Sequence, residues 1–285
     1  MKLISIIIPT YNRAKLLSQV ISSYLCQFVP KEIIIIDDGS DAINKRILEN
    51  LVGLSNTIKY IRHPRRLGLP RARNTGIDAS KGDFVFFGED DVWLEERHIE
   101  ILISHLDRAG ADIIAGRLIN VESLDRRTLP HLCSRKADII DLKYLTGDFS
   151  IEADDDIYVP FVHACSLAYK QIFRAIRFDP AFFNNTCFRE ETDFYLRAGA
   201  RGFRVMFCPH AIAFHLKRSN SSPNNLGGCG SKKSLISKTQ NQLNNILFAW
   251  KDKMILKRMG INPFIFVIKY WLRAFLSKVY IKKTS

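Results

Sequence analysis

Short apolar and β-branched runs alternate with longer amphipathic stretches in the first half of the chain. The runs predict strands buried on both faces of a sheet, at residues 3–9, 32–37, 57–63 and 83–88. The stretches between and after them predict helices, at residues 14–26, 42–51, 70–80 and 92–107. A further strand is expected at 112–121. Strands and helices repeated in this order are typical of parallel βαβ units with right-handed crossovers.

The second half has a less regular pattern. Charge clusters without a clear period occupy residues 122–160. After them we expect two strands and one helix, at 161–169, 203–208 and 189–200. A Ser-, Asn- and Gly-rich segment at 219–234 predicts a mobile loop, and the tail beyond it is expected to be helical.

Composition and charge narrow the class of protein. The 285 residues are 47% hydrophobic and 25% charged, which suits one large α/β domain with a buried core. The segment 217–285 holds 14 of the 42 Lys and Arg residues but one of the 29 acidic residues, so the formal net charge of +13 comes from the tail. A nucleic-acid-binding fold would spread positive charge over its body, and we expect no nucleic-acid partner.

Two further patterns bear on cellular location. No uncharged apolar run approaches the roughly 18 residues that a membrane span needs, and the apolar stretch that stops at Pro9 predicts a strand rather than a signal peptide. The six cysteines include no C-x-x-C pair, which is typical of neither a zinc site nor a disulfide scaffold. We therefore expect reduced thiols and a cytoplasmic protein.

Polar residues gather where the predicted strands end. The first, second and fourth strands run into Pro9–Arg13, Asp37–Ser40 and Gly88–Asp91, and the segment Arg65–Gly76 adds four arginines. Each piece alone could be a turn or a helix cap. Because ligand sites of open parallel sheets lie beyond the carboxyl ends of the strands, the pieces together predict one site.

These segments carry a resemblance to a known family. Ser5–Arg13, Ile36–Ser40, Arg71–Gly76 and Glu89–Asp91, in this order, resemble the nucleotide-sugar domain of glycosyltransferase family two, over roughly residues 3–110. The resemblance implies the GT-A fold: an α/β, Rossmann-like, mostly parallel sheet flanked by helices. It also implies an inverting sugar transferase that uses a nucleoside-diphosphate sugar and Mn²⁺ or Mg²⁺.

The resemblance assigns roles to single residues. Asp90 and Asp91, with Glu89 beside them, stand where the family binds its metal, although Gly88 replaces the Asp that usually opens this motif. His215 stands where family members often complete the metal or diphosphate site, with His210 as a weaker candidate. The nucleotide is expected to contact Pro9, Thr10, Tyr11, Arg13, Asp38, Arg71, Arg73, Asn74 and Asp90.

Inversion needs a general base for the acceptor hydroxyl. The segment 188–197 resembles the family's Glu-Asp-x-Asp helix start, with Glu191 where Asp is usual. Glu191 is our candidate base, and Asp193 and Glu190 are the alternatives. Acidic residues in a first helical turn are also stabilised by the helix dipole, which would explain them without catalysis.

The basic tail has two interpretations. Aromatic and basic residues alternate through a predicted helix that begins near Pro263. Such a helix either packs on the domain with its lysines in water, or lies on an anionic membrane surface. We favour peripheral membrane contact through residues 255–285, on the cytoplasmic face.

The sequence thus predicts a catalytic domain at 1–217 and a loop and basic helical tail at 218–285. Residues 1–110 would bind the nucleotide sugar, with uridine diphosphate favoured, and 111–217 would hold the base and the acceptor. The acceptor would be a saccharide or a lipid-linked saccharide of surface-polysaccharide synthesis. The alternatives are a degenerate domain that binds nucleotide sugars without turnover and, less favoured, a nucleotidyltransferase, which would carry a Gly-rich, Lys-containing loop after strand one.

Overall fold

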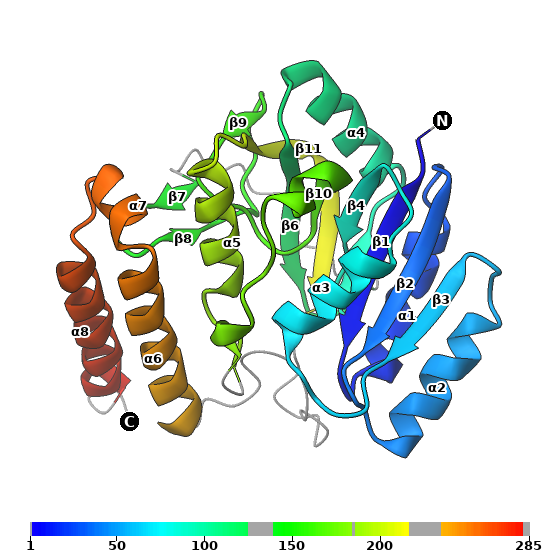
Figure 1. Cartoon of the computed structure of the whole chain (residues 1–285), viewed down its shortest axis with the longest axis horizontal. Helices are drawn as coiled ribbons and strands as arrows, with labels where there is room; N and C mark the ends of the chain where they lie inside the picture. The colour runs from blue at the N-terminus through cyan, green and yellow to red at the C-terminus, as the bar shows by residue number, and fades with distance from the viewer. Residues whose placement is uncertain (1, 125–138, 184–185, 217–234, 282–285) are drawn as a thin grey trace.

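A central sheet with helices on both faces forms the body of the molecule (Figure 1). The computed structural model describes residues 2–124, 139–183, 186–216 and 235–281. Within them the expected α/β fold is confirmed, whereas the loop expected at 219–234 lies outside the described residues.

The sheet has the strand order β3-β2-β1-β4-β10-β6-β11-β5. Its parallel part consists of β1 (Ile4–Thr10), β2 (Lys31–Asp37), β3 (Ile58–Arg62) and β4 (Phe84–Phe87). The direction reverses at β10 (Ser166–Tyr169), which is antiparallel to both β4 and β6 (Ile113–Val121). The far side contains β11 (Val205–Leu216), parallel to β6, and the short β5 (Val92–Leu94) and β9 (Ile157–Tyr158). A separate small hairpin is formed by β7 (Ile140–Asp141) and β8 (Thr146–Gly147).

Two apolar cores lie on the two faces of the sheet. Alternate residues of β1 divide between them, so that Ile6 and Ile8 enter one core and Ile7 enters the other. The first core is closed by α1 (Ala14–Leu25), α2 (Ala42–Val52) and α4 (His98–Ala109). The second is closed by α3 (Leu69–Ala79), α5 (Glu190–Gly199) and residues of the tail helices α6 (Leu235–Lys251), α7 (Lys253–Arg258) and α8 (Pro263–Ile281).

Helix α3 lies unusually close to β1. A Cβ atom at Gly76 would come within 2.3 Å of Ile7 Cγ2, so only glycine permits this approach. The helix carries Arg73 one turn before Gly76, and its distance from the sheet therefore sets how far that side chain can reach.

Three sequence-based predictions of secondary structure need correction. The helix expected at 92–107 is divided into β5 and α4, because Val92–Leu94 pair with β11. The strand expected at 161–169 is reduced to β10, and the strand expected at 203–208 extends to Leu216. His215 therefore lies inside a strand, paired with Val92, rather than after one.

The tail helices pack on the domain by one side and expose the other. Phe248, Leu256 and Phe266 are fully buried in the second core, whereas Trp250, Phe264 and Trp271 are between 56% and 73% exposed. Helix α8 begins at Pro263, as predicted. Among the described residues, no helix combines the length and apolarity that crossing a bilayer requires.

A buried pair of carboxyl groups joins the tail to α5. Asp252, between α6 and α7, is 2% exposed and faces Asp193 of α5. Asp193 is fully buried and contacts the Lys251 ammonium at 3.2 Å and Arg197 Nε at 2.8 Å. Burial, together with the charge of Asp193, raises the pKa of Asp252 to about 7. The Asp252 carboxyl is thus protonated in the folded protein under mildly acidic conditions.

This raised pKa predicts a pH-dependent contribution to stability. The folded protein binds a proton at Asp252 that the unfolded chain releases near its ordinary pKa of 3.8, so the stabilisation is lost as pH rises from about 4 to about 7. Between about pH 5 and about pH 8, this loss lowers the unfolding free energy of the parent protein. In Asp252→Asn, whose side chain cannot titrate, we expect the fall over the same range to be about 2 kcal/mol smaller. Urea titrations at both pH values measure this difference, and parallel pH profiles for the two proteins would contradict it.

Candidate functional site

A cavity of about 230 Å³ opens at the edge where β1, β2 and β4 end. Its walls come from six parts of the chain: the end of β1 with the residues after it, the segment after β2, the region where α3 begins, the acidic segment after β4, the region where α5 begins, and His215 of β11. The described residues that line it are Pro9, Thr10, Tyr11, Arg13, Asp38, Arg66, Leu69, Ala72, Arg73, Glu89, Asp90, Asp91, Cys187, Glu190, Glu191 and His215. Most of the residues singled out in the sequence therefore meet at one place.

Asp38 organises the loop that enters α3. Its carboxylate accepts bonds from the backbone N–H groups of Leu67 and Gly68, at 2.8 and 2.7 Å, and lies 2.8 Å from His63 Nδ1. Gly68 has a φ of +93°, which favours glycine at this turn. The loop thereby holds Arg66, whose guanidinium lies 4.4 Å from the Tyr11 ring centroid. Arg66 is not among the residues predicted from the sequence, since nothing local distinguishes it from the three neighbouring arginines.

Arg13 joins the two aspartates after β4. Its guanidinium contacts Asp90 at 2.8 Å and forms a close ion pair with Asp91. Asp90 also accepts a 2.8 Å bond from the Thr10 hydroxyl. Both carboxylate oxygens of Asp90 are therefore engaged by neighbouring side chains, whereas Asp91 faces His215, with Nε2 at 3.2 Å.

The charges of this acidic segment are strongly perturbed. Burial opposes ionisation of Asp91, yet its contacts with His215 and Arg13 hold the pKa of this carboxyl well below its ordinary value. Burial, with the charge of Asp91, raises the pKa of Glu89 to about 7. Burial lowers the pKa of His215, but the hydrogen bond with Asp91 and the negative charges of Asp91 and Glu89 raise it above its ordinary value. The cavity thus holds more acidic than basic groups beside His215, an arrangement that attracts a cation.

Tyr24 accounts for Gly88, the departure from the family motif. A Cβ atom at residue 88 would lie 2.7 Å from Cε1 of Tyr24 and 3.1 Å from Cγ1 of Ile8, so no longer side chain fits. The Tyr24 hydroxyl donates to the backbone oxygen of Glu89 at 2.9 Å and accepts from its N–H at 3.1 Å. The ring therefore fixes the backbone from which Glu89 and the two aspartates project.

Arg73 connects α3 with the start of α5. Its side chain is 1% exposed and forms a close ion pair with Glu190, which is equally buried, and a 3.1 Å contact with Glu191. Burial raises the pKa of Glu190 well above its ordinary value despite this partner. The Glu191 side chain is 33% exposed and borders the cavity, so it is the acid of this turn with most access to a ligand.

Four candidate residues, with His210 of β11 among them, lie away from the cavity lining that the structure describes. Arg71 is exposed on α3. Asn74 bonds to the backbone of Phe178 through both its amide nitrogen, at 2.8 Å, and its amide oxygen, at 3.1 Å. Asp193 is fully buried with its ion-pair partners. Asn74, expected to contact the nucleotide, and Asp193, an alternative base, thus make contacts within the fold in this structure.

A second cavity of about 480 Å³ adjoins the first. Cys187, Glu191 and His215 line both cavities. In the second, His163 donates through Nε2 to the backbone oxygen of Gly116 at 2.8 Å, and burial lowers its pKa to about 4. The imidazole is therefore neutral, and its buried Nδ1, which has no partner among the described residues, can accept a hydrogen bond.

Comparison with known proteins agrees with this architecture. The sequence profile described as "Glycosyl transferase family 2" matches residues 5–220. The glycosyltransferase GlyG of Streptococcus pneumoniae is 25% identical over 77% of this chain and 72% of its own length. A Campylobacter jejuni GalNAc(5)-diNAcBac-PP-undecaprenol beta-1,3-glucosyltransferase is 27% identical over 71% of this chain and 64% of its own. The Staphylococcus aureus poly(ribitol-phosphate) beta-N-acetylglucosaminyltransferase TarP is 33% identical over half of this chain and 45% of its own.

A solved structure extends the comparison to the fold. The crystal structure of Staphylococcus aureus TarS in complex with UDP-GlcNAc covers 87% of this chain with a TM-score of 0.59, and the chain covers 66% of that structure. At 17% identity this likeness shows the fold alone. The profile match over most of the chain, together with this architecture, shows that the protein belongs to glycosyltransferase family 2.

Proposed function

We propose that this transferase moves a sugar, with inversion, from a nucleoside-diphosphate sugar to a saccharide or lipid-linked acceptor. The observation that carries the proposal is the position of Glu191, which borders two adjoining cavities with Cys187 and His215. One cavity would hold the donor and the other the acceptor. Family membership supports a transferase over a domain that binds without turnover and over a nucleotidyltransferase.

The first cavity suits a nucleoside diphosphate. The Arg66 guanidinium and the Tyr11 ring offer a flat surface on which a base can stack, and Asp38 lies beside them in the same lining. We favour uridine because the similarly folded TarS binds UDP-GlcNAc. The diphosphate would lie toward Asp91 and His215.

The residues after β4 fit a divalent cation. Glu89 and Asp91 supply oxygen ligands of the kind that Mn²⁺ and Mg²⁺ prefer, and His215 adds an imidazole 3.2 Å from Asp91. Burial and the neighbouring charge of Asp91 both oppose ionisation of Glu89, and a bound cation would offset both effects. Such an ion supplies electrostatic stabilisation of the leaving diphosphate. Asp90, already engaged by Thr10 and Arg13, would support this segment rather than bind the ion.

The transfer itself requires one proton acceptor. The acceptor hydroxyl oxygen attacks the anomeric carbon as the bond from that carbon to the diphosphate oxygen breaks, and the hydroxyl proton passes to Glu191. Arg73 holds the Glu191 carboxylate at 3.1 Å.

The tail supports contact with a membrane that carries the acceptor. Its exposed aromatic and apolar residues form what we call the tail surface, made of Trp250, Met254, Phe264, Ile268 and Trp271. Lys253 and Lys257 border the same region, beside Trp250 and Phe264. Apolar groups flanked by lysines suit an interface with anionic lipid. The relative that acts on an undecaprenol-linked saccharide is consistent with a lipid-linked acceptor here.

Replacing the proposed base should lower turnover and leave donor binding intact. We expect Glu191→Gln to reduce kcat by about 10²- to 10⁴-fold, because the amide cannot take the proton. Release of uridine diphosphate measures kcat, and calorimetry measures donor affinity. Glu49→Gln, at an exposed acid on α2, is the matched control and should retain full activity. Equal kcat values for the two variants would remove the assignment.

Metal-dependent nucleotide binding should depend on Asp91. We expect Asp91→Asn to weaken uridine diphosphate binding in Mn²⁺ by about tenfold or more and to change it little when a chelator is present. Asp155→Asn, at an exposed acid, serves as the control. Thermal-shift titrations with and without Mn²⁺ report both conditions. If the parent protein gains no affinity from Mn²⁺, the metal assignment is wrong, although the base assignment can still stand.

Membrane contact should follow the tail surface and the lipid charge. In flotation assays, we expect the full chain to bind vesicles that contain phosphatidylglycerol and not vesicles of phosphatidylcholine alone. Combined replacement of Trp250, Phe264 and Trp271 by alanine should remove most of the bound fraction. Phe28→Ala, at a 66% exposed aromatic elsewhere, should have no effect. Equal binding by both variants would contradict a role for the tail surface.

A further inference from the structure

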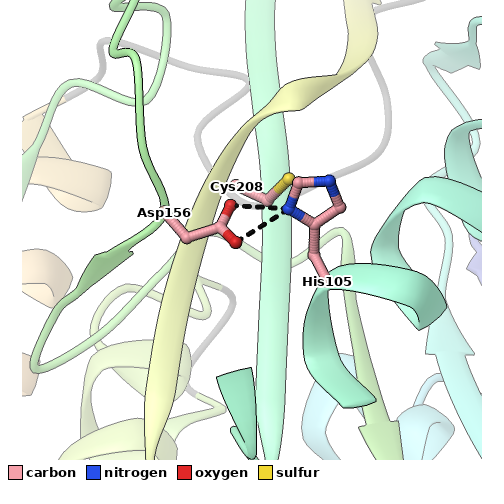
Figure 2. Close-up of side chains that lie close together, drawn as sticks. All are labelled: His105, Asp156 and Cys208. Atoms are coloured by element: carbon pink, nitrogen blue, oxygen red, sulfur yellow. Dashed lines mark hydrogen bonds and ion pairs between the residues drawn. The ribbon is translucent and has the colours of Figure 1, made fainter. Parts of the chain in front are cut away.

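A second group of metal-binding side chains lies outside the two cavities (Figure 2). His105 comes from α4, Asp156 from the segment before β9, and Cys208 from β11. One donor atom from each residue lies within 4.8 Å of the other two. The two oxygens of Asp156 lie 2.7 and 3.0 Å from His105 Nδ1. Figure 2 shows the three side chains pointing toward one another from three separate elements.

The backbone of β11 explains why Cys208 reaches this position. The pairing of β11 with β6 shifts register between Phe207 and Ile212, which places Cys208 at the start of the irregular stretch. Nearby, Phe207 pairs with Ile157 of β9 and so brings Asp156 alongside. The ring of His210, from the same stretch, lies 5.3 Å from the ring of His105. A second imidazole therefore borders the group.

His105 Nδ1 faces two groups with opposite hydrogen-bonding needs. One is the Asp156 carboxylate, which requires a donor, and the other is Nη2 of Arg108, 3.0 Å away, which requires an acceptor. A ring nitrogen cannot serve both, because it either carries a proton or does not. When Nδ1 donates to Asp156, Nη2 of Arg108 has only its longer contact with Asp156, at 3.4 Å, as an acceptor among the described side chains here. A metal ion would accept electron pairs from both the nitrogen and the carboxylate. Arg108 supplies a positive charge beside Asp156, at 3.4 Å. Its side chain is 68% exposed, so it can move away when a metal ion binds.

Cys208 is fully buried beside Asp156. Burial and the neighbouring Asp156 raise the pKa of its thiol to about 12, although hydrogen bonds with the backbone of His210 and Ala211 lower it. A cation bound beside the sulfur would favour the thiolate, as in protein metal sites generally.

The group is separate from the proposed donor site. Cys208 and His215 lie on the same strand, and at about 3.3 Å per residue they are roughly 20 Å apart. The proposal below therefore does not depend on the function proposed above. Imidazole, carboxylate and thiolate together suit zinc, whereas the oxygen-rich segment after β4 suits Mn²⁺ or Mg²⁺.

We propose that His105, Asp156 and Cys208 bind a structural zinc ion, with the fourth position taken by water or by His210. The ion would join α4, the segment before β9 and β11. The sequence analysis expected no zinc site because it considered cysteine pairs close in the sequence, and these ligands are drawn together by the sheet.

Cobalt binding to the full chain tests the proposal. After removal of metal with a chelator, we expect one equivalent of Co²⁺ to produce a thiolate-to-cobalt charge-transfer band, which Zn²⁺ then abolishes. The donor site also has cysteines nearby, because Cys187 lines that cavity and Cys165 Sγ lies 3.9 Å from Glu89. A band that arises there would survive in Cys208→Ser and be lost in Asp91→Asn, so the two variants distinguish the two sites. Cys208→Ser should lose the band, and Cys26→Ser, at an exposed cysteine elsewhere, should keep it.

Two results would overturn the proposal: no charge-transfer band in the parent protein, or a band that survives in Cys208→Ser. Circular dichroism establishes whether each variant folds. If Cys208→Ser does not fold, His105→Gln is read instead, and a band of unchanged intensity and affinity there overturns the proposal equally. A Zn²⁺-induced rise in the melting temperature of the parent that is absent in the folded variant supports it.

Discussion

The ion pairs of Arg73 join α3 to the start of α5 across the candidate site. The guanidinium comes from α3, which packs on the parallel strands, and its partners open α5 on the other side of the site. A buried guanidinium is tolerated only with a nearby compensating charge. Loss of Glu190 would leave Arg73 with the partly exposed Glu191 as its acidic partner, whereas loss of Glu191 leaves the buried contact with Glu190 in place. Glu190 provides the buried partner, and Glu191 is thereby held at the boundary between the cavities. The geometry of the proposed reaction depends on this contact.

The approach of α3 to the sheet prepares this contact. Gly76 allows the helix to approach Ile7, and the Phe178 ring lies 5.1 Å from the Arg73 guanidinium. The backbone of Phe178 is in turn tied to α3 by both ends of the Asn74 amide. Asn74 therefore positions the apolar wall around Arg73 without reaching the cavity itself.

The parallel part of the sheet was predictable because its strands are buried on both faces and read as continuous apolar runs. The division of residues 92–107 into β5 and α4 was not, since β5 exists through pairing with β11, more than a hundred residues later. The same distinction applies to the site. Thr10, Asp38 and Asp91 follow from strand ends, which are local signals. Arg66, Asn74 and Asp193 depend on partners far along the chain, and a pattern of residue types does not contain those partners.

Arg189, the residue before α5, connects the start of α5 with the tail helices. Arg189 is buried, donates to the backbone oxygens of Tyr144 and Leu145 at 2.7 Å, and bonds to Asn245 of α6 at 3.0 Å. Its guanidinium lies 5.3 Å from the Phe266 ring and 4.8 Å from the Tyr270 ring of α8. An aromatic enclosure built by the tail thus surrounds the residue next to the two glutamates. Shortening the chain before α6 would remove these contacts and expose the guanidinium beside the turn that carries Glu191, so α6 and α8 are part of the packing of the candidate site.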